Sequence, residues 1–295
     1  MAHDESFSVT LNETRSFEPS AEFAAQANLR SDELRRRTEI GRKDPEGYWA
    51  QAARELLWRK PFTRVLEWNP PSAKWFSDGR MNASENCLDR HLEKNSEKTA
   101  ILWEGEPTVG GAPETLRWSY RELHERVVRM TAGLRHLGLK KGDAVAIYMP
   151  LVPESVVAML ACARAGLTHT VVFGGFSAEA LKDRMLDANA KAVLTADYGW
   201  RKGAKVALRE QVVHALTDVP AVETVITLHR DTVGAAFGKP TPLASVGKIG
   251  RATEYDWQAV SSTFDPGHPD TRGEAEAVEA EHPSAARARP RMSST

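Results

Sequence analysis

The stretch AVAIYMPLVPESVVAMLACARAGLTHTVVFGGFSAEALKDRMLDANAKAVLTA, residues 144–196, decides the fold of this chain. Three short apolar runs within it, at 144–149, 169–173 and 191–196, are typical of buried strands. The segments between them are long enough for helices of ten or more residues. Strands alternating with such helices form right-handed crossovers, so the stretch predicts an α/β fold: a mostly parallel sheet with flanking helices.

Four kinds of boundary signal support the helices around these strands. Ser119 and Glu122 have the spacing of a capping box, which opens a helix. Gly138 stands where a helix C-cap glycine is expected. Pro153 suits a first helical position, and Ser177 is placed to cap a further helix. The domain therefore begins with a helix that ends before the first strand.

Beyond the opening stretch, the sequence predicts a loop at 197–203, a helix over roughly 205–216 and a strand at 223–228. The loop at 197–203 and another at 174–177 each follow a predicted strand. In open parallel sheets, ligands bind beyond the carboxyl ends of the strands. We therefore expect the two loops to be neighbours at a ligand-binding edge.

Composition divides the chain into four segments. Residues 1–44 are polar and predict a flexible arm with one helix over 31–40. Residues 45–104 predict an irregular segment whose tryptophans anchor it to the fold, followed by the α/β part at 105–263. Residues 264–295 have almost no large apolar side chain and predict a disordered tail. The tryptophans of the second segment are Trp49, Trp58, Trp68, Trp75 and Trp103.

Charge and targeting signals narrow the class of protein. The 39 basic and 40 acidic side chains give a formal net charge of -1, so no global field attracts nucleic acid or an anionic membrane. The first residues have no apolar core of a signal peptide, and no apolar run approaches the ~20 residues of a membrane span. The nine histidines do not have the spacing of metal ligands. With only Cys87 and Cys162, we expect a cytoplasmic protein without a metal site, although one disulfide stays open.

Gly174 and Gly175 are the first candidate site residues. They follow a strand and precede a helix, where glycines let a ligand approach and free N–H groups attract an anion. The pair is equally consistent with a tight strand-to-helix turn, since neither a dinucleotide nor a P-loop motif is completed. Glu104 and Glu106 flank a predicted turn, and we expect both to be exposed.

Arg201, Lys202 and Lys205 form a basic cluster around Gly203. Guanidinium and ammonium groups hold phosphate, but a solvated charged loop explains the same residues. Trp200 stacks on a base or covers the core, and the residues alone leave both readings open.

Four stretches resemble the N-terminal part of AMP-forming acetyl-CoA synthetases (acetate–CoA ligases) of the adenylate-forming superfamily. They are KPFTRVLEWNPPSAKWFSDGRMNASENCLDRHL (60–92), TAILWEGE (99–106), VAIYMPLVPESVVAMLACARAGLTHTVVFGGFSAEALKDRM (145–185) and LTADYGWRKG (194–203). The match covers roughly 45–263. It implies that 105–263 is the first α/β part of a large N-terminal adenylation domain, preceded by the Trp-rich segment.

The resemblance also implies a reaction. In this family acetate and ATP, with Mg²⁺, give acetyl-adenylate and pyrophosphate, and the thiol of CoA then displaces AMP. A basic loop of the pattern Arg-x-Gly-Arg or Arg-x-Gly-Lys contacts the nucleotide end of CoA. Arg201 matches its first position, Ala204 stands at its fourth, and Lys205 follows directly. The implied CoA site comprises Gly174, Gly175, Arg201, Lys202, Gly203, Ala204 and Lys205.

The family continues with an apolar strand, a Ser/Thr/Gly-rich loop ending in Lys-Gly that wraps the ATP phosphates, and a C-terminal domain with a catalytic lysine. The 295 residues contain none of these, so no catalytic residue or ATP site is assigned. Residues 275–283 resemble the lead-in to that strand and 284–295 do not, which suggests a frameshift from about 284.

The expected function is therefore that of a truncated synthetase fragment that is inactive alone. Two alternatives remain. One is a residual CoA- or nucleotide-binding remnant. The other is a partner that associates with a full-length synthetase through an exposed sheet edge.

Overall fold

The computed structural model describes residues 15–106, 111–238, 242–263 and 280–281. The chain divides into two compact units, Met1–Glu55 and Leu56–Thr295, and each is described by itself. No helix in the described ranges combines the length and the apolar character that a membrane crossing requires.

The first unit contains three helices: α2 (Ala21–Gln26), α3 (Ser31–Lys43) and α4 (Pro45–Ala53). The helix predicted over 31–40 is present as α3. Asp44 accepts a hydrogen bond from the backbone N–H of Gly47, and this side chain caps α4 with Pro45 at its first position. The flexibility predicted for 1–44 stays a prediction, and 1–14 lie outside the described residues.

The second unit begins with the Trp-rich segment, which is less irregular than predicted. A hairpin joins β1 (Leu66–Asn69) to β2 (Ser72–Trp75) through the cis peptide bond Pro70–Pro71. The rings of Trp58, Phe62, Trp75 and Phe76 form a cluster with centroid separations of 4.7–6.0 Å. Trp68 lies outside this cluster with 67% of its surface exposed, so it does not anchor the segment.

Buried hydrogen bonds join the Trp-rich segment to the α/β part. The segment continues through β3 (Arg80–Met81), a π-helix (Glu85–Asp89) and α5 (Arg90–Asn95). The fully buried amide of Asn82 donates to the carbonyl oxygen of Ala163 at 2.9 Å and accepts from the backbone N–H of Ser84. Satisfied buried amides of this kind hold the two parts of the unit in one arrangement.

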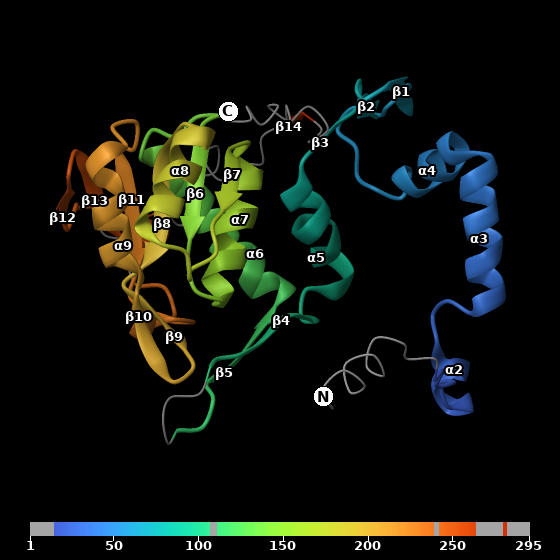
Figure 1. Cartoon of the computed structure of the whole chain (residues 1–295), viewed down its shortest axis with the longest axis horizontal. Coiled ribbons are helices and arrows are strands. Elements are labelled where there is room, and N and C mark those ends of the chain that lie inside the picture. Colours follow the sequence, from blue (N-terminus) through green and yellow to red (C-terminus); the bar gives the residue numbers. More distant parts are fainter. Residues whose placement is uncertain (1–14, 107–110, 239–241, 264–279, 282–295) are drawn as a thin grey trace, which may run out of the picture. The chain divides into compact units, whose positions relative to one another are not determined.

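A six-stranded sheet forms the centre of the second unit (Figure 1). Its strand order is β12-β13-β11-β8-β6-β7, and every neighbouring pair is parallel except β12 with β13. The mostly parallel sheet predicted from the sequence is therefore confirmed. Its strands are β6 (Ala144–Tyr148), β7 (Thr168–Val171), β8 (Ala190–Ala196), β11 (Thr224–Leu228), β12 (Gly247–Ile249) and β13 (Ala252–Asp256).

Helices cover both faces of this sheet because the chain reverses direction across it. The first crossover runs outward from β6 to β7, and the next runs back past β6 to β8. Right-handed crossovers in opposite directions place their helices on opposite faces. α6, α7 and α10 accordingly pack together, and α8 packs with α9. These helices are α6 (Tyr120–His136), α7 (Pro153–Ala165), α8 (Ala178–Ala188), α9 (Leu208–Ala215) and α10 (Trp257–Ser262).

The predicted helix boundaries are confirmed. Ser119 and Glu122 form the complete capping box of α6, and Gly138 just beyond this helix has a φ of 87°. Pro153 occupies the first turn of α7, and Ser177 accepts a hydrogen bond from the backbone of α8. All residues of β6 and β11 are buried, as a sheet covered on both faces requires.

The prediction for 197–207 is partly wrong. Instead of a loop and the start of a helix, a hairpin forms from β9 (Tyr198–Arg201) and β10 (Ala204–Ala207), and α9 begins only at Leu208. Lys202 and Gly203 both have positive φ, 51° and 74°, as a two-residue hairpin turn requires. Pairing with β9 thus overrides the helix propensity of the alanines and the lysine in AKVA at 204–207.

A second hairpin joins β4 (Thr99–Glu104) to β5 (Thr115–Ser119). Single 3₁₀ turns lie at Leu216–Asp218 and Arg230–Thr232. The tail predicted to be disordered lies outside the described residues, except for β14 (Ala280–Glu281), which pairs with β3. The predicted boundaries at 44, 104 and 263 stay predictions.

Candidate ligand-binding site

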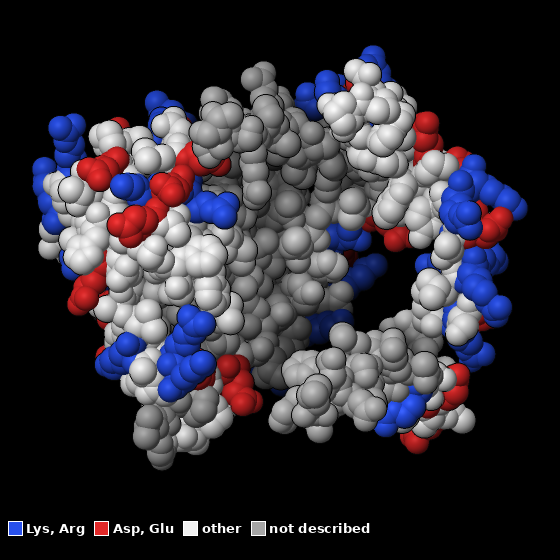
Figure 2. Space-filling model, in the orientation of Figure 1, with Lys and Arg blue, Asp and Glu red and all other residues white. Residues whose placement is uncertain are grey.

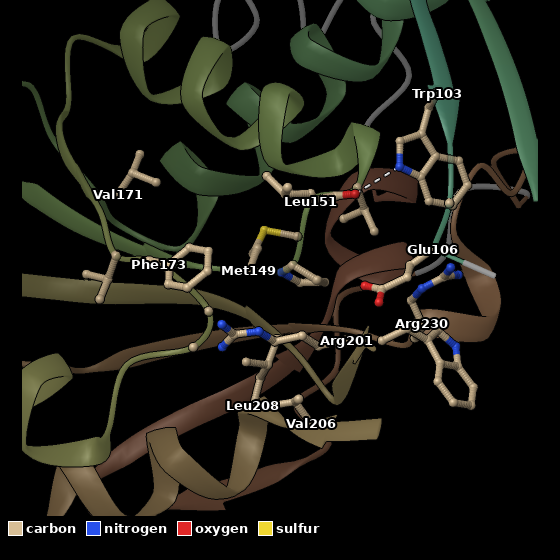
Figure 3. A pocket seen from close by; sticks show the side chains of 18 of the residues that line it. Trp103, Glu106, Met149, Leu151, Val171, Phe173, Arg201, Val206, Leu208 and Arg230 are labelled. Carbon is tan, nitrogen blue, oxygen red and sulfur yellow. Dashed lines mark hydrogen bonds between the residues drawn. The ribbon is translucent and has the colours of Figure 1, made fainter. Parts of the chain in front are cut away.

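A pocket of ≈ 390 Å³ opens at the carboxyl ends of β6 and β8 (Figure 3). The strand order reverses between these two strands, and open α/β sheets bind ligands in the crevice at that point. Six segments from different parts of the chain supply its walls. They lie at 103–106 at the end of β4, 149–152 after β6, 171–175 at β7, 199–201 in β9, 206 and 208 where β10 passes into α9, and 230 after β11.

Apolar side chains dominate the walls and remain accessible to a ligand. Leu151 and Phe173 expose 85% and 53% of their surface. Trp103 donates a hydrogen bond from its indole N–H to the carbonyl oxygen of Leu151 at 2.8 Å, which ties the β4 segment to the loop after β6 (Figure 3). An apolar pocket with a few polar groups is the usual form of a small-molecule site.

The glycine pair lines this pocket. A Cβ on Gly175 would lie 2.5 Å from Nη1 of Arg201 and 2.7 Å from the ring of Phe173. A Cβ on Gly174 would lie 3.2 Å from the carbonyl oxygen of Met149, a tight contact. Gly175 is therefore needed for the close approach of Arg201, a role more specific than the turn considered from the sequence.

The basic residues surround the same opening. Arg201 places its guanidinium 5.5 Å from the ring centroid of Phe173, and Lys205 places its ammonium 3.9 Å from the centroid of Tyr198. Within the described ranges, none of Arg201, Lys202 and Lys205 forms an ion pair with a carboxylate. Figure 2 shows basic and acidic side chains adjoining one another in the region of the β9–β10 hairpin. Arg201 at the pocket is thus available to an anion.

The structure brings only part of the predicted set into the pocket. Gly174, Gly175 and Arg201 line it, and the loops at 174–177 and 197–203 are neighbours as predicted. Lys202 and Gly203 form the hairpin turn, and Ala204 and Lys205 lie on β10; none of these four lines the pocket. Trp200, which is half-buried, also lines it, and both interpretations of this ring stay open.

Sequence reasoning missed Arg230. Its side chain, 6% exposed, donates from Nη2 to Oε2 of Glu114 at 2.7 Å and lies 5.3 Å from the ring centroid of Trp103. It follows β11 within two residues, so its place at a strand's carboxyl end was a usable signal. Glu106 was predicted to be exposed, and it is. Its place at the pocket wall had no sequence signal.

Asp197 joins the strands beneath the pocket. One of its carboxylate oxygens accepts from the backbone N–H groups of Tyr198 and Arg230, both at 2.8 Å. The phenol of Tyr198 donates to Asp231 at 2.6 Å, and this hydrogen bond, with burial, raises the pKa of Tyr198 to about 12. Tyr198 is therefore neutral at physiological pH and contributes a donor rather than a charge.

Cys87 and Cys162 are both free thiols, so the disulfide left open by the sequence is not formed. In the part of the chain that the structure describes, no group of three His, Cys, Asp or Glu side chains is arranged to hold a metal ion. The groups that line the pocket offer a ligand apolar surface, the guanidinium of Arg201 and the carboxylates of Glu104 and Glu106.

Comparison with known proteins identifies the class to which this fold and pocket belong. The AMP-binding enzyme family matches residues 88–269, and the chain belongs to that family. Immediately before it, residues 37–87 match the acetyl-coenzyme A synthetase N-terminus. The chain is thus similar to acetyl-CoA synthetases in particular, with the part that precedes their adenylation domain.

Curated relatives agree with this placement. The chain is 46% identical over 227 residues to an acetyl-coenzyme A synthetase of Gemmatimonas aurantiaca, covering 77% of this chain and 34% of that protein. It is 48% identical over 233 residues to that of Laribacter hongkongensis, covering 77% and 35%. The chain therefore spans about a third of the length of these relatives.

A solved structure supports the fold. Acetoacetyl-CoA synthetase from Streptomyces lividans superposes with a TM-score of 0.65 at 22% identity, covering 84% of this chain and 38% of that one. At this level of identity the likeness establishes the α/β architecture.

Proposed function

We propose that these residues form the CoA-binding side of an AMP-forming acetate–CoA ligase. The observation that carries the proposal is the guanidinium of Arg201 beside an apolar pocket at the sheet's switch point. This guanidinium forms no ion pair with a carboxylate in the part of the chain that the structure describes. CoA combines phosphates with a long, largely uncharged chain that ends in a thiol. A cation at the rim of the pocket suits the phosphates of CoA, and an apolar interior suits its uncharged chain.

The reaction we propose for the whole enzyme has two steps. Acetate attacks the α-phosphate of ATP with Mg²⁺ to give acetyl-adenylate and pyrophosphate, and the CoA thiolate then displaces AMP. Gly174 and Gly175 supply space for CoA beside Arg201, while the hairpin residues Lys202, Gly203, Ala204 and Lys205 supply donors and charge near the nucleotide end. We assign ATP, Mg²⁺ and the catalytic groups to residues beyond these 295, so the chain alone is inactive in our proposal.

Calorimetric titration with CoA tests the binding part. We expect the Arg201→Ala variant to bind CoA at least about tenfold more weakly than the unmodified chain, the loss typical of a charge-assisted contact to phosphate. Arg251→Ala is the matched control. This exposed arginine lies in the turn between β12 and β13, at the amino end of β13, far from the carboxyl edge. Equal affinities for the unmodified chain and Arg201→Ala would remove CoA from the proposed site.

Acetate-dependent exchange between ATP and labelled pyrophosphate tests the inactivity. This assay reports adenylation without CoA. We expect no exchange above background from the 295-residue chain, because no phosphate-binding loop neutralises the charge that develops at the α-phosphate. Exchange that scales with protein concentration would contradict this part and leave the CoA proposal untouched.

We further propose that the outer edge of β7 associates with additional polypeptide. Among the described strands β7 has a neighbour on one side only, and Val171 at its end is 58% exposed. Exposed strand edges with apolar side chains readily pair. Val171→Lys should shift size-exclusion elution toward the monomer, and an unchanged profile would count against the association.

We also propose that the protein acts in the cytoplasm. Both cysteines are free thiols, as a reducing compartment favours, and their retention as free thiols in cell extract would test this localisation.

A further inference from the structure

A carboxylate occupies one of the donors at the proposed CoA site. Glu106 accepts a hydrogen bond from the backbone N–H of Lys202 at the tip of the β9–β10 hairpin. In a two-residue hairpin the first turn residue contributes no N–H to the strand ladder. This N–H therefore faces outward, where it can donate to a group outside the hairpin. Figure 3 shows the Glu106 carboxylate turned toward the pocket that Arg201 also lines.

The surroundings of this contact are those of an anion site. Arg201 and Lys202 are consecutive cations, neither pairs with a carboxylate in the described part of the chain, and Lys202 and Gly203 both have positive φ. Backbone N–H groups at such turns, next to guanidinium, bind phosphate oxygens. The negative group that the structure places on this donor belongs to the protein itself.

We propose that Glu106 is an internal competitor of the CoA site, and that an incoming phosphate displaces its carboxylate from the Lys202 N–H. The inference rests on the proposed CoA function and adds a residue that sets affinity. Glu106 is exposed, so water and ligand both reach the hydrogen bond that it makes. An exposed interaction of this kind stabilises the fold only slightly, and its displacement therefore costs little.

Three variants distinguish competition from two simpler roles. Glu106→Gln removes the charge and keeps the shape, and Glu106→Ala removes both. Glu210→Gln is the matched charge control, because Glu210 is exposed on α9 and does not line the pocket. If Glu106 competes with phosphate, both Glu106 variants bind CoA about three- to tenfold more tightly and Glu210→Gln changes little.

Other patterns would overturn the inference. Unchanged affinity in Glu106→Gln with weaker binding in Glu106→Ala would mean that the side chain only positions the turn. Equal gains in Glu210→Gln and Glu106→Gln would mean a general effect of net charge.

A second probe separates this inference from the proposed function. Inorganic pyrophosphate is titrated at constant ionic strength into isotope-labelled chain, and NMR follows the backbone amide of Lys202. We expect this amide to shift at several-fold lower pyrophosphate concentration in Glu106→Gln than in the unmodified chain. If the Lys202 amide responds in this way but the chain does not bind CoA, the anion site is supported and the CoA proposal is rejected. A Lys202 amide that responds to pyrophosphate in neither protein would overturn the inference, even if CoA binds elsewhere.

Discussion

The guanidinium of Arg164 meets the carboxylate of Asp89 with two parallel hydrogen bonds, Nη1 to Oδ2 at 2.8 Å and Nη2 to Oδ1 at 3.0 Å. The Arg164 side chain is only 8% exposed, whereas Asp89 is 30% exposed. The pair joins the end of α7 to the π-helix before α5. Because the arginine is buried, its charge depends on this partner.

Replacing Asp89 with alanine should lower the free energy of unfolding by about 2–4 kcal/mol, because it removes the carboxylate that accepts two hydrogen bonds from the buried Arg164 guanidinium. Urea denaturation measures the loss. Glu97→Ala is the matched control, since it breaks the Arg121–Glu97 pair, whose side chains are 66% and 75% exposed. This exposed pair should contribute no more than about 1 kcal/mol. Similar losses for the two variants would contradict the assignment of a structural role to the buried pair.

Acid should remove the contribution of Asp89. Burial raises the pKa of this carboxyl, but hydrogen bonds from His124 and Arg164 outweigh burial, and the net pKa lies well below its usual range. A carboxyl with a depressed folded-state pKa stabilises fully above its unfolded pKa of about 3.9 and loses that contribution as pH falls below it. The stability difference between the unmodified chain and Asp89→Asn should therefore shrink from about pH 4 downward. A difference that is constant across this range would refute the linkage.

Gly175→Ala should weaken CoA binding by about three- to tenfold while leaving the fold intact. The added Cβ would meet Nη1 of Arg201 and the ring of Phe173, which both have exposed space into which they move. Displacing the guanidinium lengthens its contact with phosphate, and charge-assisted hydrogen bonds depend on distance. Calorimetric titration and a melting curve check the two parts. Gly247→Ala, whose Cβ enters open space, should alter neither. A melting temperature lowered in step with affinity would show that the effect is structural.

Gly133→Ala should destabilise the protein by about 1–3 kcal/mol, the usual range for overpacking. Its Cβ would lie 2.8 Å from the carbonyl oxygen of Val260, where α6 packs against α10. Backbone cannot turn away as a flexible side chain does, so the helices must separate. Alanine's advantage over glycine within a helix, roughly 1 kcal/mol, partly offsets this loss. Denaturant titration measures whether the free energy of unfolding falls or rises in Gly133→Ala. A gain in stability would show that α10 moves freely.

Much of the fold followed from local signals. The strand β6 is a continuous apolar run, and β8 and β11 are mostly apolar. The caps at Ser119, Pro153 and Ser177 are formed by residues adjacent in sequence. Such features need no knowledge of the tertiary structure. The β9–β10 hairpin was missed because Lys-Gly is a weaker hairpin signal than Asn-Gly or Asp-Gly, and Ala and Lys favour helix.

The site was harder to predict than the fold. Gly174, Gly175 and Arg201 were found because they follow predicted strands. The roles of Trp103 and Arg230 depend on contacts between segments far apart in sequence, such as the hydrogen bond from Arg230 to Glu114, which lies 116 residues away. No local pattern encodes which side chains from separate segments meet across a crevice. Family resemblance supplied a ligand class but not these partners.

The strand order also has a consequence for synthesis at the ribosome. β6 pairs on both sides with strands that follow it in sequence, first β7 and later β8, and β8 gains β11 later still. Until the residues of β8 have left the ribosome, β6 therefore has an open edge, and the crevice between β6 and β8 does not exist. Arg230 lines that crevice, so the crevice is complete only after residue 230 has emerged. A nascent chain therefore cannot bind ligand early, and protection of this sheet during translation falls to helix packing or to chaperones.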